Sequence, residues 1–248
     1  MALIVHKYGG TSMGSTERIA NVAKRVAKWM RAGHQVVVVP SAMSGETNRL
    51  LGLAKEINPD ANPRELDQIA STGEQVSSGL LALALMREGV DAVSYAGWQV
   101  TVHTDSAFTK ARIKSIDDQK ILNDLNAGRA VVVTGFQGVD PEGNITTLGR
   151  GGSDTSAVAV AAALKAGRQA LILMPEIALT GQFLKRFERR FGVRIMTAYG
   201  LTDYCMATAY SAQDPREKLG SCGRARLGVE VRIADENDMP LPAGQDGE

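Results

Sequence analysis

Residues 36 to 39 read Val36-Val37-Val38-Val39, and this run of four valines decides the fold. β-Branched residues favour strands, and an unbroken apolar run has no polar side to turn toward water. Such a strand is buried on both faces, which is typical of a parallel sheet covered by helices on each side. The run therefore predicts a covered parallel strand near the N-terminus.

Helix and strand patterns alternate on both sides of the valine run. Before it, Leu3 to Val5 predicts a short strand, and a helix with one apolar face follows, capped by Ser15 and ended by Gly33. Further on, the sequence predicts a helix over Ser71–Met86, strands over Ala92–Tyr95 and Val131–Thr134, and a helix over Ser153–Lys165. This alternation indicates an α/β fold, a three-layer sandwich with a mainly parallel sheet, and the C-terminal segment is expected to be β-rich around Val229–Ile233.

Composition narrows the class of protein. Of the 248 residues, 44% are apolar and 22% are charged, which is typical of a globular protein, and a formal charge of +1 excludes a net basic field for nucleic acid. The longest apolar run, Leu80–Met86, is too short to cross a bilayer, and the N-terminus lacks the basic segment of a signal peptide. We therefore expect a cytoplasmic protein with no membrane partner. Cys205 and Cys222 fit no metal-ligand spacing, so we expect reduced cysteines and no metal site built from protein ligands.

Two glycine-rich stretches suit an anion. Residues 7–12 (KYGGTS) end a predicted strand, and residues 147–155 (TLGRGGSDT) open a predicted helix. Glycines let backbone N–H groups approach an anion closely, and a helix start adds partial positive charge. The first stretch by itself is also consistent with an ordinary turn, and it is not a Walker A loop, because G-x-x-x-x-G-K-[ST] is absent. Turn chemistry alone accounts poorly for the second, which has three glycines beside an arginine.

Two further stretches are polar. Residues 41–48 (SAMSGETN) follow the valine strand at its carboxyl end, where α/β folds bind ligands. Residues 71–75 (STGEQ) place Glu74 in the first turn of an otherwise apolar helix. Taken separately, an ordinary capped loop explains the first, and a glutamate favoured by the helix dipole explains the second.

Together, and in this order, the four stretches resemble the catalytic domain of the aspartate kinases, in the amino acid kinase superfamily. The stretches VSYAGWQVTVHTDSAFTKARI and GFQGVDPEGNITTLGRGGSDTSAVAVAAALKA extend the resemblance over residues 1–167. It implies transfer of the γ-phosphoryl group of ATP to the β-carboxylate of L-aspartate, with ATP and Mg²⁺ as cofactors. It also implies a role in amino-acid biosynthesis, on the route to lysine and threonine.

The resemblance also implies roles for individual residues. Lys7 and Asp154 would be catalytic, Glu74 would face the ammonium of aspartate and Arg150 its α-carboxylate. The residues implied to bind the nucleotide are Lys7, Tyr8, Gly9, Gly10 and Ser41; those implied to bind the substrate are Thr47, Glu74, Arg150, Gly151, Gly152 and Ser153. Because the nucleophile is the carboxylate of the substrate, catalysis would consist of positioning and electrostatics.

The remaining third of the chain departs from the family pattern. A stretch of the type T-D-V-D-G-V-Y-T, which forms much of the ATP pocket in the family, does not follow Ala166. Residues 168–192 instead resemble a segment of the primosomal replication helicase, and residues 193–248, through AYGLTD and GSCGR, resemble the adenylate-forming acyl-CoA synthetases. The resemblances imply a chimera of three segments, 1–167, 168–192 and 193–248, with impaired phosphoryl transfer.

Three alternatives to an aspartate kinase stay open. They are a catalytically inactive α/β scaffold, an adenylate-forming fragment and a helicase-like fragment that binds nucleic acid. A nucleic-acid partner is not expected, because Phe183, Phe187 and Phe191 recur at helical spacing and favour a core helix with a solvated basic face. The kinase family is usually oligomeric, and the sequence leaves the oligomeric state open.

Overall fold

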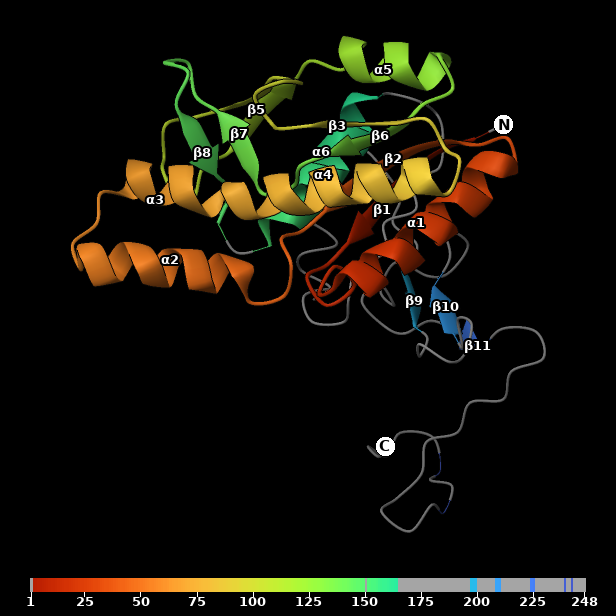
Figure 1. Cartoon of the computed structure of the whole chain (residues 1–248), viewed down its shortest axis with the longest axis horizontal. Coiled ribbons are helices and arrows are strands. Elements are labelled where there is room, and N and C mark those ends of the chain that lie inside the picture. The colour runs from red at the N-terminus through yellow and green to blue at the C-terminus, as the bar shows by residue number, and fades with distance from the viewer. Residues whose placement is uncertain are drawn as a thin grey trace. The chain divides into compact units, whose positions relative to one another are not determined.

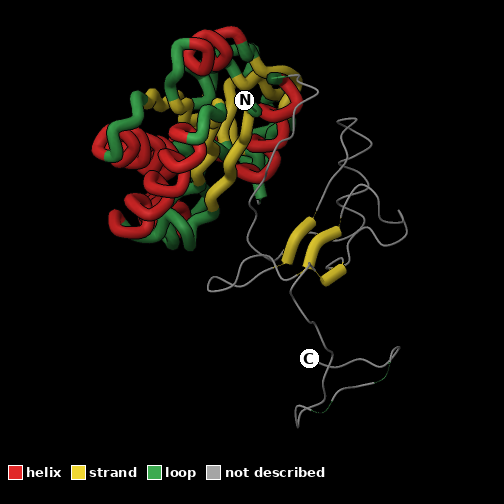
Figure 2. Tube along the Cα trace, turned by 90° about the vertical axis from the view of Figure 1, so that its right-hand side faces the viewer, coloured by secondary structure: helices red, strands yellow, loops and turns green. Residues whose placement is uncertain are grey.

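The chain forms two compact units, Met1–Pro175 and Glu176–Glu248. The computed structural model describes residues 2–149, 151–164, 197–199, 208–210, 224–225, 239 and 242 (Figures 1 and 2). In the second unit, three short strands pair in antiparallel fashion in the order β11-β10-β9; they are β9 (Thr197–Tyr199), β10 (Thr208–Tyr210) and β11 (Arg224–Ala225). The helicase-like segment 168–192, both cysteines and the stretch Val229–Ile233 lie outside the described residues.

A parallel sheet of four strands forms the centre of the first unit. Its order is β1-β2-β6-β3, with β1 at Leu3–Tyr8, β2 at Gln35–Pro40, β6 at Ala130–Val133 and β3 at Ala92–Tyr95. The four valines of β2 have no exposed surface. The prediction of a parallel strand covered on both faces is therefore confirmed.

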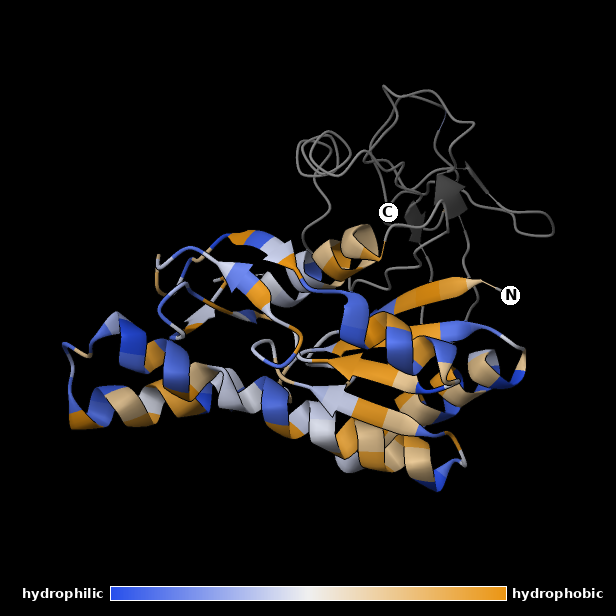
Figure 3. Cartoon of the chain, turned by 90° about the horizontal axis from the view of Figure 1, so that it is seen from above, coloured by the Kyte–Doolittle hydropathy of each residue, from blue (hydrophilic) through white to orange (hydrophobic). Residues whose placement is uncertain are grey.

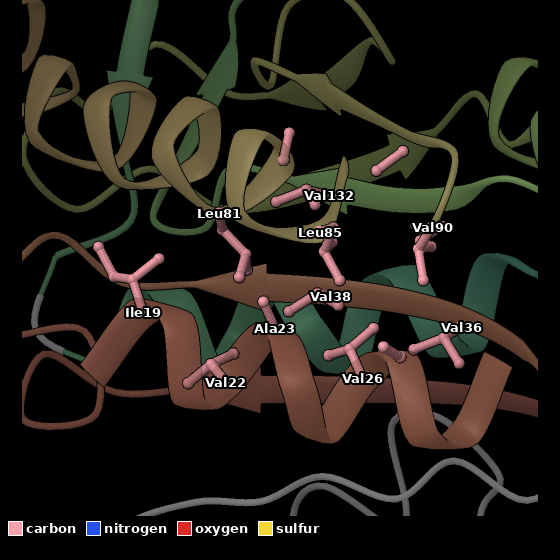
Figure 4. Close-up of a cluster of buried hydrophobic side chains, with 14 of the residues drawn as sticks. Ile19, Val22, Ala23, Val26, Val36, Val38, Leu81, Leu85, Val90 and Val132 are labelled. Atoms are coloured by element: carbon pink, nitrogen blue, oxygen red, sulfur yellow. The ribbon is translucent and has the colours of Figure 1, made fainter. Parts of the chain in front are cut away.

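Helices cover the two faces of this sheet. Because successive side chains of a strand point to opposite faces, Val36 and Val38 belong to one hydrophobic cluster, and Val37 and Val39 to another. The first cluster includes side chains of α1 (Thr16–Arg31) and α4 (Thr72–Arg87), as Figure 4 shows, and the second includes side chains of α5 (Gln119–Asn126) and α6 (Gly152–Ala163). The three-layer α/β sandwich is thus confirmed, and Figure 3 shows how strongly apolar its central strands are.

The two ends of α1 are formed by the residues expected from the sequence. The Ser15 side chain accepts a hydrogen bond from the Arg18 N–H at 3.2 Å, which caps the helix, and Gly33 follows its end with a φ of +82°. Strand β1 is longer than the expected run Leu3–Val5 and continues to Tyr8. This extension brings Lys7 to the end of the strand.

A second sheet was not predicted from the sequence, and neither were α5 and two further helices. The strands β5 (Ile113–Ile116), β4 (Val102–Thr104), β7 (Gln137–Val139) and β8 (Ile145–Thr147) form a mixed sheet in the order β5-β4-β7-β8. The two further helices are α2 (Glu46–Ile57) and α3 (Pro63–Ala70), and they lie at the same end of the unit as β7 and β8 (Figure 1). Strands β4, β7 and β8 have three residues each, which is too short a pattern to stand out from loops. None of the helices among the described residues is both long and apolar enough to span a membrane.

Candidate functional site

A cleft of about 410 Å³ lies at the carboxyl edge of the central sheet. The segments that follow β1, β2 and β6 line it, together with the first turn of α4 and the glycine-rich loop before α6. Its lining includes nine residues expected from the sequence, Lys7, Gly10, Ser41, Thr47, Glu74, Gly151, Gly152, Ser153 and Asp154. The stretches that the sequence offered separately are therefore brought together in one place.

An ion pair between Lys7 and Asp154 lies in this cleft. The Lys7 Nζ is 2.7 Å from Asp154 Oδ1, and the two side chains are 5% and 17% exposed. The two groups form an ion pair, but their relative orientation does not make a hydrogen bond. Lys7 shares its face of β1 with Leu3 and Val5, the face that packs on α6, and Asp154 lies in the first turn of α6. A cation beside a helix N-terminus favours a bound anion such as a phosphate.

Glu74, in the first turn of α4, contributes a buried carboxylate to the cleft. Its Oε1 accepts the Ala42 N–H at 3.1 Å, whereas its Oε2 is buried and has no hydrogen-bond partner among the described residues. Burial raises the pKa of Glu74 to about 7, partly offset by the hydrogen bond from the Ala42 backbone. A buried carboxylate oxygen without a partner is costly, so this group suits a ligand cation such as an ammonium.

The loop after β2 is held against α4. The Ser77 hydroxyl donates to the Ser41 carbonyl at 2.7 Å, and Gly45, with a φ of +81°, turns the chain into α2. Only a residue without Cβ adopts that conformation at little cost. Ser41 and Thr47 consequently line the same cleft as Glu74.

The loop before α6 needs glycine for reasons of space. A Cβ on Gly152 would lie 2.7 Å from the Phe136 ring and 2.9 Å from the Leu148 Cβ. Gly149 and Gly151 have positive φ angles of 73° and 76°. These residues form a compact turn over the first residues of α6, with the Gly152 N–H donating to the Gly149 carbonyl at 3.0 Å.

Phe136 lines the cleft but had no role assigned from the sequence. Its φ is +71°, which is rare for a residue with a bulky side chain and is concentrated at functional sites. Its N–H donates to the Ser156 hydroxyl at 2.9 Å, and its carbonyl accepts the Leu148 N–H at 2.9 Å. Its place directly after a buried strand and beside Gly135 was the signal available in the sequence.

Two expected site residues, Tyr8 and Gly9, do not line the cleft, and the placement of a third is not described. Arg150 lies outside the described residues. The Tyr8 side chain belongs to the hydrophobic core, where its hydroxyl is 3.2 Å from His6 Nδ1, because alternation along β1 turns it to the face opposite Lys7. Gly9 is buried and does not line the cleft, and its carbonyl accepts the Met13 N–H at 3.1 Å. The implied nucleotide contacts of Tyr8 and Gly9 stay predictions, and any contact by Tyr8 would come from its backbone.

No group of three metal-ligating side chains occurs within the described part of the chain. Among the residues that the structure describes, Asp154 and Glu74 are the carboxylates that line the cleft. One or two carboxylates beside phosphate oxygens match the way proteins hold Mg²⁺.

Comparison with known proteins agrees with this geometry. The amino acid kinase family matches residues 2–175. An aspartate kinase of Pseudomonas fluorescens (strain SBW25) is 68% identical over 168 residues, which are 67% of this chain and 41% of that protein. Aspartokinase 2 of Bacillus subtilis (strain 168) is 52% identical over 168 residues, 68% of this chain and 41% of that protein. The chain thus spans about two fifths of the length of these relatives.

Solved structures match the same region. The crystal structure of E. coli aspartokinase III in complex with aspartate and ADP superposes with a TM-score of 0.61 at 26% identity, covering 73% of this chain and 52% of that one. The aspartate kinase from Synechocystis gives a TM-score of 0.59 at 46% identity, covering 69% of this chain and 28% of that one. The fold, the cleft and the matched sequence agree, and the chain belongs to the amino acid kinase family.

Proposed function

We propose that the cleft holds L-aspartate beside the phosphates of ATP and catalyses transfer of the γ-phosphoryl group to the β-carboxylate. The observation that carries this proposal is the pairing of opposite charges in one cleft. Lys7 supplies a cation for a phosphoryl oxygen, and the free Oε2 of Glu74 supplies an anion for an ammonium. The close relatives, which are aspartate kinases by name, support the same substrate.

The reaction needs no nucleophile from the protein. A β-carboxylate oxygen forms a bond to the γ-phosphorus as the bond from that phosphorus to the β,γ-bridging oxygen breaks, so aspartyl phosphate and ADP result. Lys7 neutralises charge on the transferring group, and Asp154 holds the Lys7 ammonium in place. Glu74, with Arg150 and Ser153, orients aspartate so that its free carboxylate points toward the phosphate.

The residues of the cleft fit the phosphate end of a nucleotide. Gly10 lines the cleft, and a Cβ there would lie 3.2 Å from the Ala42 carbonyl oxygen, so the Gly10 backbone packs closely against the loop after β2. Asp154, which lines the cleft, would hold Mg²⁺ together with the phosphates, and the ion would supply charge neutralisation. ATP and Mg²⁺ are therefore part of the proposal.

The sequence after residue 167 supports a further part of the proposal. The nucleotide motif of the family has no counterpart there, so we expect phosphoryl transfer to be slow. The three-segment organisation, with helicase-like residues 168–192 and synthetase-like residues 193–248, is proposed on sequence resemblance alone, as is a cytoplasmic location.

The test uses the full chain with L-aspartate, Mg²⁺ and ATP. Aspartyl phosphate is trapped with hydroxylamine, and aspartate binding is measured separately by calorimetry. Glu74→Gln should abolish binding, whereas Glu56→Gln, a matched change at an exposed residue of α2, should not. Binding without product would identify an inactive scaffold, pyrophosphate exchange with a carboxylic acid would identify adenylation, and absence of both binding and product would refute the proposal.

A further inference from the structure

Asp67, on α3, is a buried carboxylate that does not line the cleft. Its side chain is 1% exposed and accepts three hydrogen bonds. The Oδ2 atom accepts the backbone N–H groups of Thr109 and Thr147, each at 2.8 Å, and Oδ1 accepts the Thr147 hydroxyl at 2.6 Å. A carboxylate with this many donors is fixed in one position.

Both partners of Asp67 adjoin the glycine-rich loop. Thr147 is the last residue of β8, and the chain continues from it through Gly149 into the loop that lines the cleft. Thr109 has a φ of +66°, which a β-branched residue adopts only when its surroundings hold it there. A Cβ on Gly149 would lie 2.9 Å from the Thr109 carbonyl oxygen, so the Thr109 turn packs directly against the loop.

The backbone of Asp67 is connected to the opposite wall of the cleft. Its carbonyl accepts the Ser71 N–H at 3.0 Å, and Ser71 is the residue from which α4 begins, three positions before Glu74. Helix α3 therefore carries Asp67, which is bound to the strand end that precedes the glycine-rich loop. The same helix leads directly into α4, which carries Glu74. Asp67 thus links the glycine-rich loop on one wall of the cleft to the start of α4 on the other.

We propose that Asp67 is a positioning residue that sets the distance between the glycine-rich loop and Glu74. The inference rests on the proposed function for its effect on aspartate, but its structural part concerns the loop alone. Loss of the Asp67 hydrogen bonds frees Thr147 and the Thr109 turn, and the loop residues then move relative to the ammonium site. Even a small displacement of the loop weakens the alignment of the ligand, although no group that touches the ligand has been removed.

Asp124 offers a matched control. It is also a buried carboxylate, 8% exposed, and it accepts the Tyr95 hydroxyl at 2.6 Å and Arg129 Nη1 at 3.0 Å. It lies on α5 and does not line the cleft. Asp124→Asn therefore perturbs a comparable network at a place remote from the loop.

The experiment compares Asp67→Asn, Thr147→Val, Thr147→Ser and Asp124→Asn in the full chain. Hydrogen exchange of peptides covering residues 145–153 reports on the loop, and calorimetry with L-aspartate reports on binding. We expect Asp67→Asn and Thr147→Val to accelerate exchange in the loop and to weaken aspartate binding about tenfold. Thr147→Ser, which keeps the hydroxyl, and Asp124→Asn should match the parent chain in both measurements.

Each outcome decides the inference. If Asp67→Asn does not fold, Thr147→Val against Thr147→Ser makes the same comparison with one hydrogen bond. Unchanged loop exchange in the Asp67 and Thr147→Val variants, or equal acceleration in Asp124→Asn, would overturn the positioning role. If the parent chain binds no aspartate, the proposed function fails, whereas the exchange data still decide whether Asp67 holds the loop.

Discussion

Replacing Glu74 by glutamine should change the way in which stability depends on pH. The Glu74 carboxyl is buried, and burial raises its pKa to about 7 from the usual 4.5. The folded chain therefore binds this proton more tightly than the unfolded chain does. Glu74→Gln keeps the shape of the protonated group and removes its titration.

The sign and size of the effect follow from linkage. Because the folded pKa is raised, the stabilising contribution of the proton is fully present below pH 4.5 and is lost as the pH rises through about 7. The gap between the two pKa values, at about 1.4 kcal/mol per pH unit, corresponds to about 3 kcal/mol. Between pH 4.5 and pH 8 the parent chain should lose this amount of stability relative to Glu74→Gln.

Urea unfolding at several pH values measures the difference directly. Taking the difference between parent and variant cancels all other titrating groups, provided that they are independent of Glu74. Glu56→Gln, at an exposed carboxyl on α2, should give a curve parallel to that of the parent. Parallel curves for the parent chain and Glu74→Gln over this range would refute the argument that burial dominates the energetics of Glu74.

The same titration has a consequence for ligand binding. An ammonium placed beside Oε2 favours the charged form of Glu74, so aspartate binding should strengthen as the pH rises toward 8. Near pH 7 about half of the chains carry the proton, and binding should release up to about half a proton. Calorimetry in buffers of different ionisation enthalpy detects this release, and proton uptake instead would contradict the assignment of Glu74.

Three further predictions concern Lys7 and two glycines. Lys7→Met leaves the Asp154 carboxylate without its cation. The change should lower the free energy of unfolding in urea by about 2 kcal/mol and reduce phosphoryl transfer by at least about 100-fold. Unchanged values of both would show that the ion pair is dispensable. Gly135→Ala would put a Cβ 2.8 Å from the Ser153 Cβ, so it should cost about 1–3 kcal/mol by the same measurement. Gly79→Ala, in α4 with open space around it, should instead stabilise by about 0.5–1 kcal/mol, and equal effects of the two alanines would contradict the steric argument.

Local patterns in the sequence predicted the central sheet and three of its four covering helices, α1, α4 and α6. The valine run, the Ser15 cap and the alternation of strands and helices each depend on neighbours a few residues away, so they can be read without knowing the fold. The second sheet escaped because its strands β4, β7 and β8 have three residues each, too few to establish a period. Helix α2 begins within the polar stretch 41–48, which is also consistent with an ordinary loop, and α3 and α5 have eight residues each, too few for a clear helical period.

The chemistry of the site divides in the same way. The sequence alone was enough to find the stretches with a cation, with glycines and with an acid in an otherwise apolar helix, because these depend on residue type and on local turn chemistry. The three-dimensional fold was needed to show that Lys7, Glu74 and Ser153 share one cleft, that the Tyr8 side chain lies in the core, and that Asp67 on α3 accepts a hydrogen bond from Thr147. The physical reason is that these relations depend on which strands pair, on strand register and on the faces that the helices cover, and all of these are set by contacts between residues far apart in the chain.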